Sequence, residues 1–315
     1  MAEITTLNPT TPGRKRLASL FNNPMAMKEL RSRMRGRRAF ALLSLYLLAL
    51  GGVITLVYLT YTTSVGMPGS TAGYTAGKGL FAAVLSVQVV LVTFVGPILT
   101  AGAISGERDR QTFDLLRTTL LSADSLVLGK LVSALSYIFL LVLVSIPLQS
   151  IAFLVGGLSL VELALSQLLI LVTAVTYAIY GLWCSATMRS TLAATVATLA
   201  GTLFITFGLP ILAFMGVFVL GTTTTWGISG SANPVLEIIM IYAGLVAAAV
   251  NLPATLIVSE VFLLDRNTLF FTSQYVGGQN VVLFSPWLLF IILHVLVAVF
   301  FYRRTVRRVR RINDV

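Results

Sequence analysis

The chain has 315 residues, of which 57% are hydrophobic and only 10% are charged, and its formal net charge is +11. A mean hydropathy of +0.93 is too high for a water-soluble domain with a polar surface. The excess of lysine and arginine is also found in nucleic-acid-binding proteins. Here the basic residues gather beside long apolar runs, which favours the positive-inside rule of membrane proteins and no nucleic-acid partner.

Seven apolar runs are long enough to cross about 30 Å of hydrocarbon at about 1.5 Å per residue. They cover residues 39–63, 79–104, 125–153, 163–187, 191–220, 238–259 and 281–302. Basic clusters precede the first run and follow the last, and both are expected on the cytoplasmic side. Seven full spans would separate the two clusters, so one run is not a span.

The weakest of the seven runs is 238–259, which follows Glu237 and contains Asn251 and Pro253. We therefore predict an all-α polytopic membrane protein with six transmembrane helices and both termini in the cytoplasm. Within an outer region at about 222–280, the run 238–259 is expected to form a re-entrant or membrane-surface helical segment.

The same pattern divides the chain into a disordered cytoplasmic tail (1–22), an amphipathic interfacial helix (23–38), the six-span domain (39–302) and a basic cytoplasmic tail (303–315). In the interfacial helix, Asn23 is suited to the N-cap and Pro24 to the first helical position. Apolar and basic side chains then fall on opposite faces, as in helices that lie among lipid headgroups. Anchoring to an anionic inner leaflet and docking of a partner are both compatible with this pattern.

A charged segment after the second run is unusual in a chain with so few charges. Phe113, Leu116 and Leu120 share one helical face, and charges of alternating sign fall at helical spacing at Glu107, Arg110, Asp114 and Arg117. We predict a helix over about 105–120 whose apolar edge enters a groove of another protein. The alternative is a solvated helix that merely joins two spans.

At these two places the chain resembles the permease subunits of ABC-2 type ATP-binding-cassette transporters. The family's N-terminal Asn-Pro and Lys-Glu-Leu-Arg are matched by Asn23, Pro24, Lys28, Glu29, Leu30 and Arg31. Its motif between spans 2 and 3 is matched by Glu107, Arg108, Thr112, Leu115, Leu116, Thr119, Ser122, Gly129 and Lys130. Residues 181–186 and Arg189 resemble its junction between spans 4 and 5, whereas residues 222–284 fit less well.

The resemblance implies that 105–120 is a coupling helix held in a cleft of a separate ABC ATPase subunit. The coupling residues would be Glu107, Arg108, Thr112, Phe113 and Leu116, with the interfacial helix, including Lys28, Glu29, Leu30 and Arg31, beside them. It also implies a second permease chain, identical or different, and a place in the prokaryotic plasma (inner) membrane. The expected function is an exporter subunit that forms the substrate path.

No catalytic, metal or cofactor site is expected in this chain, and ATP and Mg²⁺ are expected on the partner ATPase. The glycine-rich segment 73–79 lacks the spacing and the Ser or Thr after lysine that a phosphate-binding loop needs. It is predicted to be a flexible outer turn. We expect removal of the apolar edge of the coupling helix to impair docking of the ATPase more than removal of Glu107 at the start of the helix.

A threonine stripe runs along the fifth span at helical spacing, and its candidate path-lining members are Thr195, Thr198, Thr202 and Thr206. Close packing against a neighbouring helix explains such a stripe equally well. A path of threonine and apolar groups would indicate a hydrophobic or amphipathic cargo.

Two other functions compete with the permease. A secondary transporter typically needs ionisable groups or broken helices near mid-membrane, but His294 is the only such side chain well inside a run, and it is interpreted as structural. Glu162, Glu237 and Glu260 fall at the edges of runs, where solvation is expected. A non-transporting polytopic scaffold is the remaining alternative.

Overall fold

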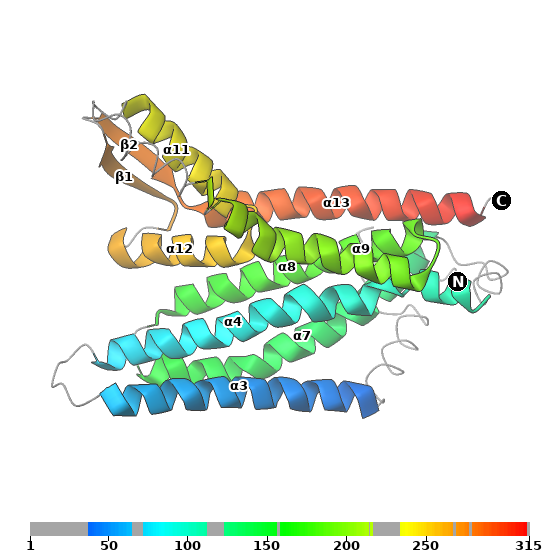
Figure 1. Ribbon diagram of the computed structural model, residues 1–315, viewed down its shortest axis with the longest axis horizontal. Helices are drawn as coiled ribbons and strands as arrows, with labels where there is room; N and C mark the ends of the chain where they lie inside the picture. Colours follow the sequence, from blue (N-terminus) through cyan, green and yellow to red (C-terminus); the bar gives the residue numbers. More distant parts are fainter. Residues whose placement is uncertain are drawn as a thin grey trace, which may run out of the picture.

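The computed structural model describes residues 37–64, 72–111, 123–155, 158–213, 215–216, 234–266, 269–276 and 279–313. This part is an elongated bundle of helices with a small β-hairpin at one end (Figure 1). Several predicted site residues lie outside the described ranges: Lys28, Glu29, Leu30, Arg31, Thr112, Phe113 and Leu116.

Six helical stretches of the described part are long and apolar enough to cross a membrane, which confirms the predicted number. They are α3 (Arg37–Ser64), α4 (Ala72–Ala101) with the short α5 (Ser105–Asp109), α7 (Ala123–Val155), α8 (Leu160–Thr187), α9 (Thr191–Leu203) with the π-helix η1 (Phe204–Gly208), and α13 (Pro286–Asn313). The candidate span within α3 is Phe40–Thr60, and residues 23–36 of the predicted interfacial helix lie outside the described residues.

The start of α3 and the end of α13 lie at the same end of the bundle (Figure 1). This arrangement requires an even number of crossings and agrees with the parity argument. The bundle end that carries α5 and the end of α13 is called the α5 end below. The opposite end, where α3 ends, α4 begins and the hairpin lies, is called the hairpin end.

Helices α4 and α8 form the centre of the bundle. Half or more of their spanning stretches is buried (50% and 56%), against 11% for α3, so α3 lies at the periphery. Leu50 of α3, Val84 and Val92 of α4, Leu141 of α7 and Leu169 of α8 pack into the main core. A second apolar cluster fills the α5 end between α7, α8 and α13.

The run 238–259 is not one span, as predicted, but parts of α11 (Pro234–Ala248) and α12 (Leu252–Arg266), each 15 residues long. Asn251 stands at the break. Its Nδ2 donates to the carbonyls of Ile205 at 2.6 Å and Thr206 at 2.9 Å, both in η1, and its Oδ1 accepts from the Ala254 amide. A π-helical turn shifts carbonyls out of the regular helical ladder, and here a side chain satisfies them.

The antiparallel hairpin of β1 (Phe271–Val276) and β2 (Gln279–Phe284) was not expected from the sequence. The predicted last span began at residue 281, but 281–284 belong to β2 and the helix starts at Pro286. Val281 and Leu283 alternate with exposed residues and pack near Leu245 and Phe262. This alternation suits a strand with one buried face, and it was hidden within a longer apolar run.

The predicted turn at 73–79 is also wrong, because these residues form the first part of α4. Where backbone groups have little access to water, a helix satisfies them within the segment itself.

Candidate functional site

The charged segment starts as a continuation of α4 and not as an independent helix. The Gly106 amide bonds to the Gly102 carbonyl at 3.0 Å and the Arg108 amide to the Ile104 carbonyl at 3.1 Å, so the helical ladder runs through the turn between α4 and α5. The amides of Ile104 and Ser105 also donate to the Ser185 hydroxyl of α8, at 2.9 and 3.0 Å. Glu107 therefore does not stand at a free helix N-terminus.

The predicted helix over 105–120 is not continuous. Helix α5 ends at Asp109, and Gln111 takes a left-handed conformation with φ of 57°. Left-handed backbone costs a residue with a Cβ about 1–2 kcal/mol, so it marks a real interruption of the helix. Asp114 and Arg117, the other two members of the predicted charge ladder, lie outside the described residues.

Glu107 and Lys130 form an ion pair that joins α5 to α7. Lys130 Nζ donates to Glu107 Oε1 at 2.6 Å and to the Ala103 carbonyl at 2.7 Å. Only 3% of the Lys130 side chain is exposed, against 24% for Glu107. A buried ammonium needs such partners, because leaving water without them is costly.

The next two residues bond to the ends of α8 and α9. Arg108 donates to the carbonyls of Met188 at 3.2 Å and Ala186 at 3.5 Å, at the C-terminal end of α8. Asp109 Oδ2 accepts from the Thr191 amide at 3.0 Å and the Thr191 hydroxyl at 2.7 Å, at the N-terminus of α9. Each charge matches the helix dipole that it meets, a cation at a C-terminus and an anion at an N-terminus.

These contacts define the α5 junction: Glu107, Arg108, Asp109, Lys130, Ser185, Ala186, Met188 and Thr191. Three consecutive charged residues of α5 each hold a different helix, namely α7, α8 and α9. The junction unites residues from two motifs that carried the resemblance, the one between spans 2 and 3 and the one between spans 4 and 5. Asp109 and Thr191 were missed as site residues, because nothing in the sequence shows that they meet.

The threonine stripe of α9 and η1 faces the interior of its own bundle. Thr198, Thr202 and Thr206 are buried, and the Thr206 hydroxyl lies 2.8 Å from the Tyr177 hydroxyl of α8. The Thr202 hydroxyl donates to its own helix and at 3.4 Å to the Thr93 carbonyl of α4. Thr195 is partly exposed and bonds to the Thr191 carbonyl. Interhelical packing is thus observed, while the path-lining role stays a prediction.

A second charged group lies at the hairpin end. Lys78 Nζ of α4 lies 2.9 Å from Glu162 Oε2 of α8 and 3.1 Å from Glu260 Oε1 of α12. Glu162 also belongs to the capping box that starts α8, with Ser159. The expectation that Glu162 is solvated is wrong, since 9% of its side chain is exposed, whereas Glu260 keeps 33%. We call these three residues the Lys78 triad.

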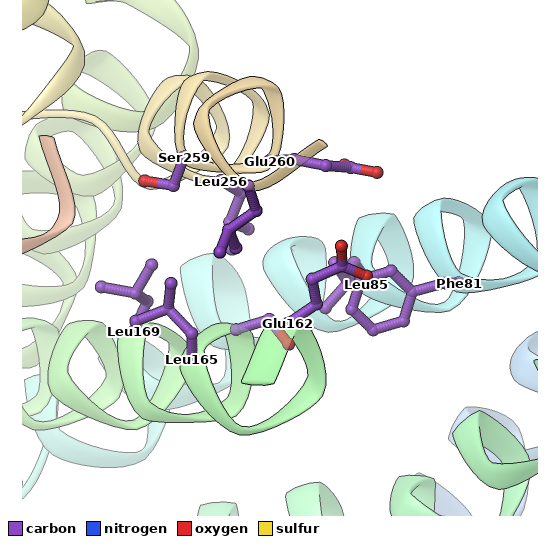
Figure 2. Close-up of a pocket in the computed structure, with 10 residues that line it drawn as sticks. Phe81, Leu85, Glu162, Leu165, Leu169, Leu256, Ser259 and Glu260 are labelled. Atoms are coloured by element: carbon purple, nitrogen blue, oxygen red, sulfur yellow. The ribbon is translucent and has the colours of Figure 1, made fainter. Parts of the chain in front are cut away.

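Two cavities adjoin the Lys78 triad. A small one of about 20 Å³ lies between α4, α8 and α12, with Glu162 and Glu260 on facing helices (Figure 2). A larger one of about 350 Å³ is lined by α4, α12 and Phe207 of η1. Leu85, Leu256 and Glu260 border both cavities.

Uncharged polar groups also gather inside the bundle. Gln149 of α7 donates to Gln88 of α4 at 3.0 Å, and Gln167 of α8 donates to Gln149 at 3.0 Å. His294 is buried, with Nδ1 3.0 Å from the Phe290 carbonyl, as a structural residue would be. Among the described residues, no three His, Cys, Asp or Glu side chains are grouped to hold a metal ion.

Among models of known families, the one described as ABC-2 family transporter protein matches residues 24–228 of the chain. The matched range contains α3, α4, α5, α7, α8 and α9, and with them the whole α5 junction. A search of the curated proteins gives no match.

Proposed function

The chain belongs to the ABC-2 transporter family and is a membrane permease of an ABC transporter, and we propose that it is an exporter subunit driven by a separate ATPase. We infer that the ATPase docks on the segment 105–122 and that the α5 junction transmits its movement into the bundle. The observation that carries this proposal is the attachment of α5 to three different helices through Glu107, Arg108 and Asp109.

The attachment makes α5 a mechanical link. The chain continues from α5 to Ala123, where α7 begins. A force on the segment between them would therefore act on both α5 and α7. At the α5 side, the force would be shared by Lys130, by the end of α8 and by the start of α9. Because α8 lies at the centre of the bundle, a small displacement of the junction would reach the helices that α8 contacts.

The distribution of charge supports a cytoplasmic α5 end, where ATP is present. That end carries Arg108, Lys130 and Arg189 together with the arginines that close α13. Within the described residues, the basic positions of the hairpin end are Lys78 and Arg266. The positive-inside rule therefore favours the α5 end as the cytoplasmic one, with both termini inside.

Further partners follow from the family. The proposed transporter contains two permease chains, identical or different, and two ATPase subunits that bind ATP and Mg²⁺. In a single chain α9 and η1 keep a wide apolar exposed face, which includes Leu192, Val196 and Phe204. A second permease chain or the surrounding lipid would cover this face.

One observation favours secondary transport instead: the Lys78 triad consists of ionisable groups. Two of its members, Lys78 and Glu162, however, lie near the start of α4 and of α8 at one end of the bundle, and Glu260 of α12 contacts Lys78 there. Coupling-ion sites of secondary transporters lie near the bilayer midplane. The ATP-driven permease therefore remains the function that the site supports best.

The test is isolation of the chain from its native membranes in mild detergent. We expect an ATP-hydrolysing subunit to co-purify with the permease, and its activity to respond to changes in the α5 junction. The proposal fails if the folded chain carries no such subunit and if vesicles that contain it move solutes in response to an ion gradient without ATP.

A further inference from the structure

We propose that the larger cavity at the hairpin end binds an amphipathic cation, with the charged group of the ligand beside Glu260 and its apolar body in the cavity. The inference deepens the proposed function, because it names the chemical class of the cargo. The inference depends on the permease assignment only for the claim that the bound cation is the transported cargo. Binding itself requires neither ATP nor a partner.

The size and the lining of the cavity fit such a ligand. About 350 Å³ lies within the range of pockets that hold small molecules. Apolar side chains from three elements line it, among them Val89 of α4, Phe207 of η1 and Leu256 of α12. Burying the apolar part of a ligand against these side chains is favourable, at roughly 25 cal/mol per Å².

The charge beside the cavity determines which sign of ligand charge is favoured. In the Lys78 triad one ammonium faces two carboxylates, at 2.9 and 3.1 Å, so the formal charges sum to −1. Within the described residues, Lys78 is the one basic group at ion-pair distance from Glu162 or Glu260. The surplus negative charge would attract a cation and repel an anion of the same shape.

Glu260 is the member that can meet a ligand. Glu162 is nearly covered and is also held by the capping box of α8. Glu260 is a third exposed and borders both cavities, and Figure 2 shows its side chain reaching out from α12. A carboxylate offers about four acceptor sites, so the contact with Lys78 leaves room for a second donor or cation.

The cavity is also open toward the side of the bundle. Val90 is 47% exposed and Ile257 is 64% exposed, and both line it. An exposed apolar face on a spanning helix borders lipid, so an amphipathic molecule would reach the cavity from the membrane. A lipid chain could fill the apolar part, but it would make no use of the unbalanced carboxylate.

The experiment compares two ions of nearly equal shape and opposite charge, tetraphenylphosphonium and tetraphenylborate. Equilibrium dialysis measures the binding of each to the full chain in phosphatidylcholine nanodiscs, and empty nanodiscs give the background. We expect saturable binding of the phosphonium that the borate does not displace. Glu260→Gln should weaken phosphonium binding about tenfold, as loss of one charge at a partly exposed site would do.

A second pair of variants tests the cavity without touching the triad. Val90→Trp places a large ring in the cavity, whereas Ile98→Trp changes a similarly exposed position of the same helix outside it. The first should abolish phosphonium binding and the second should preserve it. Equal binding of both ions, unchanged binding in Glu260→Gln, or unchanged binding in Val90→Trp would each overturn the proposal. Because ATP is absent, none of these results bears on the ATPase partner.

Discussion

Asp109 Oδ2 accepts two hydrogen bonds from Thr191, one from its amide at 3.0 Å and one from its hydroxyl at 2.7 Å, across 82 residues of sequence. The first turn of α9 thus obtains one acceptor from the end of α5, besides the Ser190 hydroxyl that accepts from the Ala193 amide. A helix N-terminus leaves amide groups without helical partners, and a carboxylate is a favoured acceptor for them. The contact ties the position of α9 to that of the charged segment.

Asp109→Ala should therefore uncouple the transporter while leaving the bundle folded. The mutation removes the link to α9, so ATP hydrolysis should continue with reduced transport. The measurement is transport per ATP hydrolysed in vesicles. Asp124→Ala is the matched control, because Asp124 forms an exposed pair with Arg310 at the same end of the bundle. Equal coupling in both variants would mean that the Asp109 contact transmits nothing.

Replacing Glu107 should destabilise the chain, because the buried Lys130 would lose its 2.6 Å contact with the Glu107 carboxylate. We expect Glu107→Ala to cost about 2 kcal/mol, less than for a fully buried pair because Glu107 is partly exposed. The double variant Glu107→Ala with Lys130→Met should be more stable than Glu107→Ala alone, since it also removes the buried ammonium that faced Glu107. Unfolding midpoints of the purified variants test this order, and the reverse order would contradict the pairing.

This expectation revises the one made from the sequence, where loss of Glu107 was ranked below loss of the apolar edge. That ranking treated Glu107 as a residue at a helix start. The structure places it inside a continuing helical ladder and against Lys130. The apolar edge itself, with Phe113 and Leu116, lies outside the described residues.

Gly181 lies where α8 crosses α4 and α9, and it should tolerate no side chain. A Cβ there would clash with the Thr100 hydroxyl and would lie 3.2 Å from Thr198 Cγ2 and 3.3 Å from the Pro97 carbonyl oxygen. Overpacking of this kind typically costs about 1–3 kcal/mol. Gly181→Ala should lower the thermal unfolding midpoint, while Gly102→Ala, which meets nothing within 4 Å, should change it little. Equal unfolding midpoints of the two variants would show that the helices can move apart at this crossing to accept a methyl group.

The orientation of the bundle can be tested by labelling with an impermeant thiol reagent on intact cells. Tyr275→Cys in the hairpin should be labelled, whereas Arg308→Cys in α13 should react only after permeabilisation. Both side chains are exposed in the structure, and the native Cys184 is buried. The opposite pattern would place the α5 end outside the cell, where a cytoplasmic ATPase could not bind it.

The sequence was sufficient to predict the spans, because hydropathy over some 20 residues follows directly from the thickness of the membrane. It was also sufficient to reject 238–259 as a span, since Asn251 and Pro253 interrupt the helical pattern. The β-hairpin was missed for a physical reason: Val281 and Leu283 alternate with exposed residues, but two strands of six residues are too short to stand out beside a long apolar helix.

The candidate site was predicted only in part. Glu107, Arg108 and Lys130 were identified by the resemblance, whereas the pairing of Asp109 with Thr191 depends on how α5 and α9 meet in space. The same limit applies to Glu162, which the sequence placed at a solvated edge. Its partner Lys78 is 84 residues away, and no local pattern shows their contact.

The most direct test of the account asks which part of the permease touches the ATPase. A photo-crosslinking amino acid replaces Phe113, and in a second variant it replaces Tyr275, 72% of which is exposed in the hairpin. Irradiation of the purified complex should join the ATPase to the chain at position 113 and not at position 275. Crosslinking at 275, or none at 113 while the ATPase still co-purifies, would contradict the claim that the segment after α5 receives the ATPase.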